Sequence, residues 1–216
     1  MHIITKKVTL KPAPFVGTRI TIEVAETDED KGFGIRVAKT AEGSSTPTVD
    51  WGDGTVETLT ANTLHEYACA GTYEVVLSDD IAEIAISSSS EVSRFRTAGA
   101  PKVIEFSSNA HKIQRIISHC FNACVNIVSV RFDCPNLTAL ASSVFSGCEK
   151  LSGRLDFPAL LTIAGKADSL PFANCGSLAE VHFSKANEDS LLECTVFNGW
   201  EQTHLGEANA VIKFDL

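Results

Sequence analysis

A group of histidines and cysteines in the middle of the chain has the residue types of a zinc site. His111, His119, Cys120, Cys124 and Cys134 lie close together in sequence, and imidazole nitrogen and thiolate sulfur are ligands that zinc prefers. Structural zinc sites usually contain a tight Cys-x-x-Cys pair, and this sequence has none. We therefore expect no metal at these residues, and a zinc site is the alternative.

A cysteine nucleophile is the second chemistry that these residue types would allow. Such a nucleophile needs an exposed thiol of lowered pKa with a base beside it. His65 belongs to a turn motif described below, His182 is the central residue of an expected strand, and no spacing of Asn or Asp completes a triad. The sequence therefore predicts no catalytic residue, no cofactor and no enzymatic activity.

Two carboxylates flank a glycine-rich turn in the first half of the chain. Asp50 and Asp53 lie in Val49-Asp-Trp-Gly-Asp-Gly-Thr55, and Gly52 and Gly54 permit positive φ there. Aspartate side chains typically accept hydrogen bonds from backbone amides in such turns. We expect a turn capped by Asp53, and a calcium site is the alternative.

A repeated motif gives Cys124 a simpler explanation than metal binding. Phe-x-x-Cys-x-x-Leu/Ile occurs at residues 121–127, 145–151 and 172–178, and a degenerate copy from Phe197 has Trp200 in place of Cys. The first residues of the four copies are 24, 27 and 25 residues apart. A period of this size is typical of a solenoid, in which each coil covers the apolar face of its neighbour. The expected stacked positions are Phe121, Cys124, Phe145, Cys148, Phe172 and Cys175.

The cysteine count fits this interpretation. There are seven cysteines, and three of them occupy one repeat position. An odd number with repeat-locked spacing disfavours a disulfide framework, and free cysteine packs like a small apolar side chain. We expect the repeat cysteines to be buried free thiols.

Each repeat continues into a short strand. The alternating triplets Val130–Phe132, Leu155–Phe157 and Val181–Phe183 predict strands whose two apolar residues point inward. Their central residues are Arg131, Asp156 and His182. Solenoids bind partners through exposed residues of this kind, so the three form a possible binding face. An ordinary solvated surface is the alternative.

Residues from about 111 to 200 resemble the BspA-type leucine-rich repeat of bacterial surface proteins. The family's units read aromatic-x-x-Cys-x-x-Leu followed by a strand, and the three copies above match this pattern. The departures are Trp200 in the last copy and Asp133-Cys134 after the first strand. The resemblance implies a solenoid with short helical or irregular returns and a surface location.

Residues from about 15 to 86 resemble the PKD domain, an immunoglobulin-like β-sandwich. The family's hallmarks are Trp-Gly-Asp-Gly, His-x-Tyr and Gly-x-Tyr-x-Val. The matching residues are Trp51, Gly52, Asp53, Gly54, His65, Tyr67, Gly71, Tyr73 and Val75. The resemblance implies a spacer or binding module of extracellular proteins, without catalysis.

The expected fold is therefore mostly β, with an immunoglobulin-like sandwich at residues 1–88 and a leucine-rich-repeat solenoid at residues 89–216. Residues 87–90 are four serines, a linker composition. Residues 81–86 form either the last sandwich strand or the first rung of the solenoid. Other strands are expected at 3–10, 19–24, 33–37 and 73–77, with capping strands at 92–96 and 102–106.

Composition excludes several classes of function. The net charge of −9 disfavours nucleic acid and anionic membrane surfaces as partners. No apolar run is long enough to span a membrane, and residues 1–7 have no apolar stretch typical of a signal peptide. The export route stays open.

Together these patterns predict a non-enzymatic bacterial cell-surface or secreted adhesion protein that recognises protein or glycan through its repeats. The alternative is a structural component of a phage particle or surface appendage that self-assembles, so a homo-oligomer is possible. The sequence does not identify the ligand.

Overall fold

The computed structural model describes residues 15–86, 102–165, 170–194 and 210–216. The strands in the first half of the chain are β1 (Thr18–Val24), β2 (Gly32–Thr40), β3 (Thr48–Asp50), β4 (Val56–Thr58), β5 (Asn62–Glu66), β6 (Gly71–Leu77) and β7 (Ile81–Ala85). Those in the second half are β8 (Val103–Ser108), β9 (Arg115–Ile116), β10 (Ser129–Phe132), β11 (Ala139–Leu140), β12 (Gly153–Phe157), β13 (Thr162–Ile163), β14 (Leu178–Phe183) and β15 (Val211–Phe214). A 3-10 turn at Lys185–Asn187 and the one-turn helix α1 (Glu188–Leu192) follow β14.

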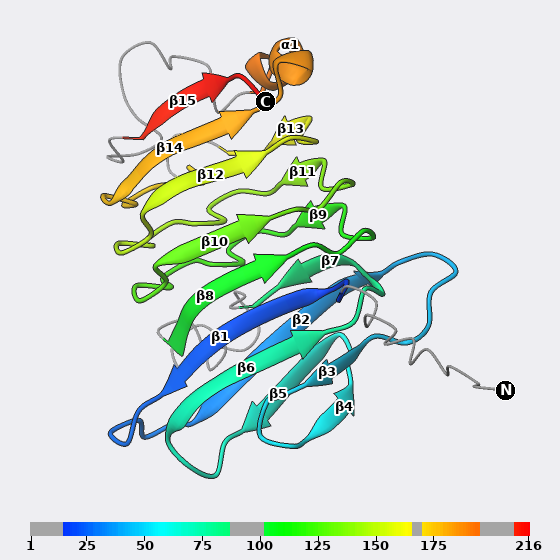
Figure 1. Ribbon diagram of the computed structural model, residues 1–216, viewed down its shortest axis with the longest axis vertical. Helices are drawn as coiled ribbons and strands as arrows, with labels where there is room; N and C mark the ends of the chain where they lie inside the picture. The colour runs from blue at the N-terminus through cyan, green and yellow to red at the C-terminus, as the bar shows by residue number, and fades with distance from the viewer. Residues whose placement is uncertain (1–14, 87–101, 166–169, 195–209) are drawn as a thin grey trace, which may run out of the picture.

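The strands form three sheets, of which the first and second face each other along most of the long axis of the molecule (Figure 1). The first has the order β10-β8-β1-β6-β3-β4, the second β13-β11-β9-β7-β2-β5, and the third β12-β14-β15. Strand β12 lies beside β10, so the third sheet continues the first. The described part of the chain is mostly β, as predicted.

In the first half, two layers of antiparallel strands face each other around an apolar core. Alternation along β1 buries Ile20, Ile22 and Val24 while Glu23 is exposed, which is the period-two pattern of a half-buried strand. Phe33 of β2 meets Trp51 edge-on at 6.5 Å between ring centroids. The strands predicted at 19–24, 33–37 and 73–77 are present as β1, β2 and β6.

Strands β7 and β8 join the two halves. Strand β7 pairs antiparallel with β2 and parallel with β9, and β8 pairs antiparallel with β1 and parallel with β10. Residues 81–86 therefore belong to both halves, and the predicted capping strand at 102–106 is β8. The predicted boundary at residue 88, the strands at 3–10 and 92–96, and the degenerate copy at Phe197 and Trp200 lie outside the described residues.

The coils that begin with β8, β10 and β12 each contain two strands. The long strands β8, β10, β12 and β14 form one column, and the short strands β9, β11 and β13 form another in the second sheet (Figure 1). The sequence predicted only the first column. The short strands have two residues each, which is too short for alternation to be visible.

The repeat phenylalanines stack as predicted. Phe121, Phe145 and Phe172 are all fully buried. The rings of Phe121 and Phe145 are parallel to within 2° at 5.0 Å, and those of Phe145 and Phe172 to within 4° at 5.3 Å. A second phenylalanine column, at 5.4 to 5.9 Å, runs along the inner side of the long strands through Phe106, Phe132, Phe157, Phe183 and Phe214. Side-chain columns therefore bind each coil to the next.

The repeat cysteines are buried and hydrogen-bonded. Cys124, Cys148 and Cys175 are fully buried, and all seven cysteines of the chain are free thiols. The Cys148 thiol donates to the Phe121 carbonyl at 3.1 Å, and the Cys175 thiol donates to the Phe145 carbonyl at 3.0 Å. Each of these two thiols thus donates a hydrogen bond to the backbone of the preceding coil. Cysteine at this position therefore links neighbouring coils in addition to filling a small apolar space.

The residue before each repeat cysteine has a left-handed backbone. The φ angles are 61° at Ala123, 79° at Gly147 and 59° at Asn174. This conformation aims backbone amides along the stack, since the amide of Ala123 donates to the Ser146 carbonyl at 2.8 Å. A left-handed backbone is costly for alanine and free of strain for glycine, so Ala123 carries strain that Gly147 does not.

Candidate binding face

The solvent side of the long-strand column forms a continuous polar surface, which we call the outer face. It lies opposite the second phenylalanine column and includes β1 and β6 at one end and β15 at the other (Figure 1). Alternation sets this arrangement, because residues next to an inward phenylalanine must point outward. The predicted binding residues Arg131, Asp156 and His182 all belong to this face by register.

Pairing register places Arg131 in a row with a second arginine. Ser107 of β8 is the register partner of Arg19 on β1 and of Arg131 on β10. We call Arg19, Ser107 and Arg131 the arginine row. Because neighbouring strands are about 4.8 Å apart, the two arginine Cα atoms flank the serine at a separation of about 10 Å.

The adjacent row carries the opposite charge. Glu105 of β8 is the register partner of Thr21 on β1 and Ser129 on β10, and Thr21 also faces Glu74 on β6. We call Glu74, Thr21, Glu105 and Ser129 the glutamate row. Arg19 bridges the two rows through an ion pair with Glu74.

Both arginines remain accessible. The Arg19 side chain is 40% exposed and its guanidinium lies 4.3 Å from the centre of the Phe15 ring. The Arg131 side chain is 76% exposed, and its Nε donates to Asp133 at 2.7 Å. Exposed pairs of this kind are worth about 0–1 kcal/mol, so a ligand can replace them at little cost.

The segment that carries Phe15 is fixed against β8 by Asn109. The Asn109 side chain donates to the Phe15 carbonyl at 2.8 Å and accepts from the Gly17 amide at 2.9 Å. A Cβ atom on Gly17 would lie 2.4 Å from the Leu77 carbonyl oxygen and 2.7 Å from the Phe15 ring. Only glycine therefore allows this close packing, which sets the position of the Phe15 ring.

Two adjoining depressions cover the two rows. One of about 230 Å³ is lined by Phe15, Gly17, Arg19, Ser107, Ser108, Asn109, Arg131 and Asp133. The other, of about 210 Å³, is lined by Arg19, Thr21, Glu74, Glu105, Phe106, Ser107, Ser129 and Arg131. They share the whole arginine row, because the small Ser107 side chain leaves a hollow between two long ones.

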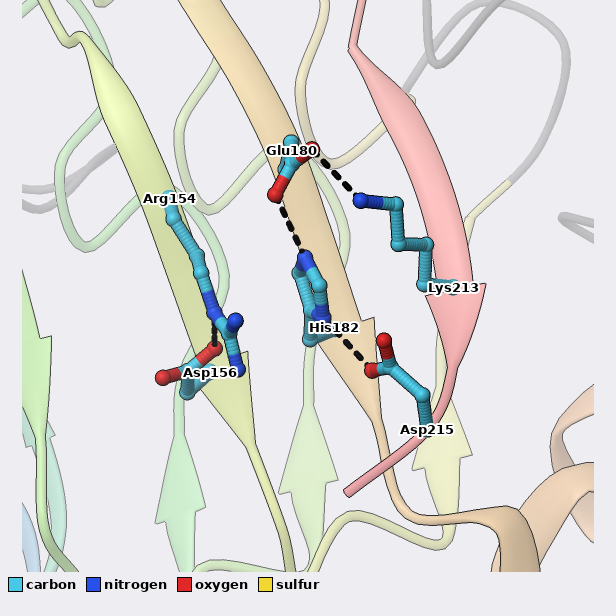
Figure 2. Close-up of polar contacts among 6 residues, drawn as sticks. All are labelled: Arg154, Asp156, Glu180, His182, Lys213 and Asp215. Atoms are coloured by element: carbon cyan, nitrogen blue, oxygen red, sulfur yellow. Dashed lines mark hydrogen bonds and ion pairs between the residues drawn. The ribbon is translucent and has the colours of Figure 1, made fainter.

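The other predicted residues lie at the far end of the outer face. Asp156, His182 and Lys213 are register partners on β12, β14 and β15. Figure 2 shows the ion pair of Arg154 and Asp156 on one side of His182, and Lys213 of β15 with Asp215, which directly follows β15, on the other. No register pairing of the described strands links this group to Arg131, since β10 and β12 are not paired.

The prediction that His182 is exposed is wrong. The side chain points outward, but it is only 2% exposed because longer neighbours cover it. Its Nδ1 lies 2.6 Å from Asp215 Oδ1, and its Nε2 lies 2.8 Å from Glu180 Oε2 (Figure 2). Both ring nitrogens are therefore already in use, and His182 fixes β15 to β14.

Lys213 completes this cluster. Its ammonium donates to Glu180 Oε1 at 2.6 Å (Figure 2). Hydrogen bonds from Lys213 and from His182 lower the pKa of Glu180 to about 2, against a smaller opposing effect of burial. The carboxylate is thus stabilised in its charged form, and the cluster is a structural joint between the last two strands.

The glycine-rich turn of the first half has the predicted hydrogen bonds. Asp50 Oδ1 accepts from the Gly52 amide at 2.9 Å, and Asp53 Oδ1 accepts from the Thr55 amide at 3.0 Å. Asp53 Oδ2 also lies 2.8 Å from His65 Nε2. Burial raises the pKa of Asp53, but the hydrogen bonds with His65 and Thr55 outweigh it, and the pKa is lowered overall.

The histidine and cysteine group does not converge on one point. Cys120, Cys124 and Cys134 are buried in the core, and burial raises the pKa values of Cys120 and Cys134. Cys134 donates to Ser108 rather than to a histidine. Within the described ranges, no three His, Cys, Asp or Glu side chains are grouped to bind a metal ion.

The repeats identify the family. A family model described as the BspA type leucine-rich repeat region matches residues 67–199 in six copies. The chain belongs to this BspA-type family. The match begins at Tyr67, between β5 and β6, well before the first clear Phe-x-x-Cys copy at residue 121. No curated protein and no solved structure matches the chain significantly, and nothing in the comparisons supports a PKD domain.

Sequence reasoning missed Arg19, Ser107 and the last rung. The predicted strand at 19–24 places Arg19 on an outward position, but only pairing register brings it beside Arg131. Strand β15 could have been predicted from the sequence, because Ile212-Lys213-Phe214 repeats the apolar-x-Phe triplet of the earlier coils.

Proposed function

We propose that this protein is a non-enzymatic binding or adhesion protein of the bacterial cell surface or the extracellular space, which recognises a protein or a glycan through its outer face. One observation carries the proposal. The outer face is a regular, solvent-exposed array of polar side chains on paired strands, with depressions at the arginine row. Solenoids use surfaces of this kind to bind partners.

The surface location rests on the family. BspA-type repeat proteins are associated with bacterial surfaces and with adhesion. The described residues contain no helix that is long and apolar enough to cross a membrane. The net charge of −9 makes nucleic acid an unfavourable partner, since phosphate contacts need a basic surface.

For the first half we propose a PKD-like, immunoglobulin-like sandwich that caps the solenoid. The motif residues support this proposal because they form one aromatic cluster. His65 stacks on Trp51 at 4.9 Å, Tyr67 meets His65 edge-on at 4.7 Å, and the Tyr67 hydroxyl donates to the Trp51 carbonyl at 2.9 Å. This cluster closes the end of the core that the coils do not reach.

Glycan and protein arrays probed with the labelled protein test the proposed function. We expect a discrete set of bound ligands whose signal falls when outer-face residues are substituted. An array without any bound ligand would contradict the proposal.

A self-assembling structural component is the second candidate. Strand β15 ends the third sheet with β14 as its one neighbour among the described strands, and an edge strand can pair with another chain. Light scattering distinguishes the candidates, because a stable homo-oligomer of the purified protein favours assembly and a monomer favours ligand binding.

A further inference from the structure

We propose that the depressions at the arginine row bind an acidic sugar, with its carboxylate between Arg19 and Arg131 and its hydroxyls on the glutamate row. The inference rests on the proposed function, because it names the ligand class of the same outer face. The ligand would be a uronic acid or a similar monocarboxylated unit of a glycan.

The carboxylate part follows from the arginine row. A guanidinium has five N–H donors arranged to match a carboxylate. The contacts described above occupy Nη1 of Arg19 and Nε of Arg131. Each arginine keeps further donors for a ligand, and the Ser107 hydroxyl between them supplies one more.

The hydroxyl part follows from the glutamate row. Glu74 and Glu105 line the second depression together with Thr21 and Ser129. Ionised carboxylates only accept hydrogen bonds, so they suit the donor hydroxyls of a sugar ring. With Asp133, three carboxylates and two arginines line the depressions, so a ligand carboxylate has to replace Glu74 and Asp133 as the arginine partners, and a second negative charge on the ligand would be repelled. This disfavours phosphate, sulfated chains and acidic peptides, and favours a ligand with one charge and many hydroxyls.

The size of the depressions agrees with a single sugar unit. At about 230 and 210 Å³, each is smaller than the roughly 300–1,000 Å³ of pockets for drug-sized ligands. Because both include Arg19, Ser107 and Arg131, a ring in one depression lies directly beside the other. A terminal or branching residue of a glycan therefore fits better than an extended peptide.

The site is partly preorganised. Phe15 restricts Arg19 by lying against its guanidinium, and Asn109 fixes the Phe15 segment to β8. A side chain that is ordered before binding loses less conformational entropy when the ligand arrives. Asn109 and Phe15 are therefore positioning residues for Arg19.

Backbone amide NMR titration of the full chain tests the inference. The probes are methyl glucuronide, methyl glucoside, acetate and inorganic phosphate. We expect saturable shifts at Ser107 and Arg131 with methyl glucuronide, and about 10-fold or greater weakening with each of the other three, because each lacks the carboxylate or the hydroxyls, or carries excess charge.

Substitutions locate the site. Arg19→Ala and Arg131→Ala should each weaken methyl glucuronide binding about 10-fold or more, the usual effect of losing hydrogen bonds to a charged group. The matched control is Arg154→Ala, because Arg154 is an outer-face arginine that is also paired with a carboxylate and is 45% exposed. This control should bind like the wild type. The melting temperature of each variant shows that it is folded.

Three outcomes overturn the inference. These are equal binding of methyl glucoside and methyl glucuronide, phosphate binding as tight as methyl glucuronide, and no saturable shift with any sugar. If the arrays show another ligand whose binding survives Arg19→Ala and Arg131→Ala, the adhesion function stands and the acidic-sugar site fails. If the arrays and the titration both show no ligand, both proposals fail.

Discussion

Phe145 is the residue whose loss should damage the repeats most. It is fully buried and lies between two parallel phenylalanine rings at 5.0 and 5.3 Å. Truncating a core phenylalanine to alanine costs about 3–5 kcal/mol from lost transfer energy and the cavity. Phe145 makes three aromatic contacts, two stacked ones and an edge-on one with Phe132 at 6.4 Å. Such contacts are worth about 0.5–1.5 kcal/mol each beyond area burial, which places the loss at the upper end of the range for a core phenylalanine. We therefore expect Phe145→Ala to lower the free energy of unfolding by about 4–5 kcal/mol.

Urea denaturation monitored by circular dichroism measures this loss. Typical domains have a total stability of about 5–15 kcal/mol, so the midpoint should fall by a large fraction. Phe145→Leu keeps most of the volume and should cost about 1–2 kcal/mol, in line with a conservative core substitution. Phe15→Ala is the surface control, because Phe15 is 37% exposed, and it should change stability by about 0.5 kcal/mol or less.

Hydrogen exchange locates the damage. Coils of a solenoid depend on their nearest neighbours, so protection should fall most between β9 and β13. The loss should become smaller through β7 and β8 and be least in β3 and β4, which are farthest along the first sheet. If Phe145→Ala unfolds at the same urea concentration as Phe15→Ala, Phe145 is not a packed stacking residue and the repeat register is wrong.

Three further predictions concern the backbone and the carboxylates. Ala123→Gly should stabilise the protein by about 0.5–1 kcal/mol, because it relieves the strain of an alanine in a left-handed backbone. Gly147→Ala should destabilise the protein by about 1–2 kcal/mol. Urea midpoints that shift in the same direction for both variants would contradict this prediction. Asp53→Ala should lower the free energy of unfolding by about 1 kcal/mol, because the turn loses its capping side chain. Adding calcium should leave the melting temperature of the wild type unchanged, whereas a calcium-binding Asp53 would raise it. The pKa of Glu180 falls from 4.5 to about 2 on folding, so ionised Glu180 stabilises the folded protein above pH 4.5, and this stabilisation is lost as the pH falls toward 2. Hydrogen exchange in β15 of the wild type should accelerate over this pH range. Glu180→Gln should remove this pH dependence.

The repeat half could be predicted in detail because its information is local and repeated. The Phe-x-x-Cys spacing alone indicated the stacked phenylalanines and buried thiols that the structure shows around Phe145 and Cys148. A single coil would not have sufficed. Agreement among three copies separated residues that the architecture requires from residues that merely occur there.

Long-range pairing could not be predicted from the sequence. Arg19 and Arg131 meet only because β8 has a partner on each side, and no local pattern encodes that choice. The prediction that His182 is exposed was wrong for a related reason. Alternation correctly indicates the direction of its side chain, but burial depends on Glu180 and Asp215, and Asp215 lies 33 residues away in sequence.

The change from antiparallel to parallel pairing at β7 and β8 gives the molecule a fixed origin and an extensible end. Strands β1 and β2 set the register of the first coil, and every later coil follows the one before it. Insertion or deletion of one complete coil would leave the local packing at both ends unchanged. Insertion would increase, and deletion would decrease, the distance between the arginine row and the Glu180–His182–Asp215 joint by about 4.8 Å, the spacing of neighbouring strands. Variants of this chain with different numbers of coils would therefore present the same depressions at different distances from their C-terminal end, in steps of one strand.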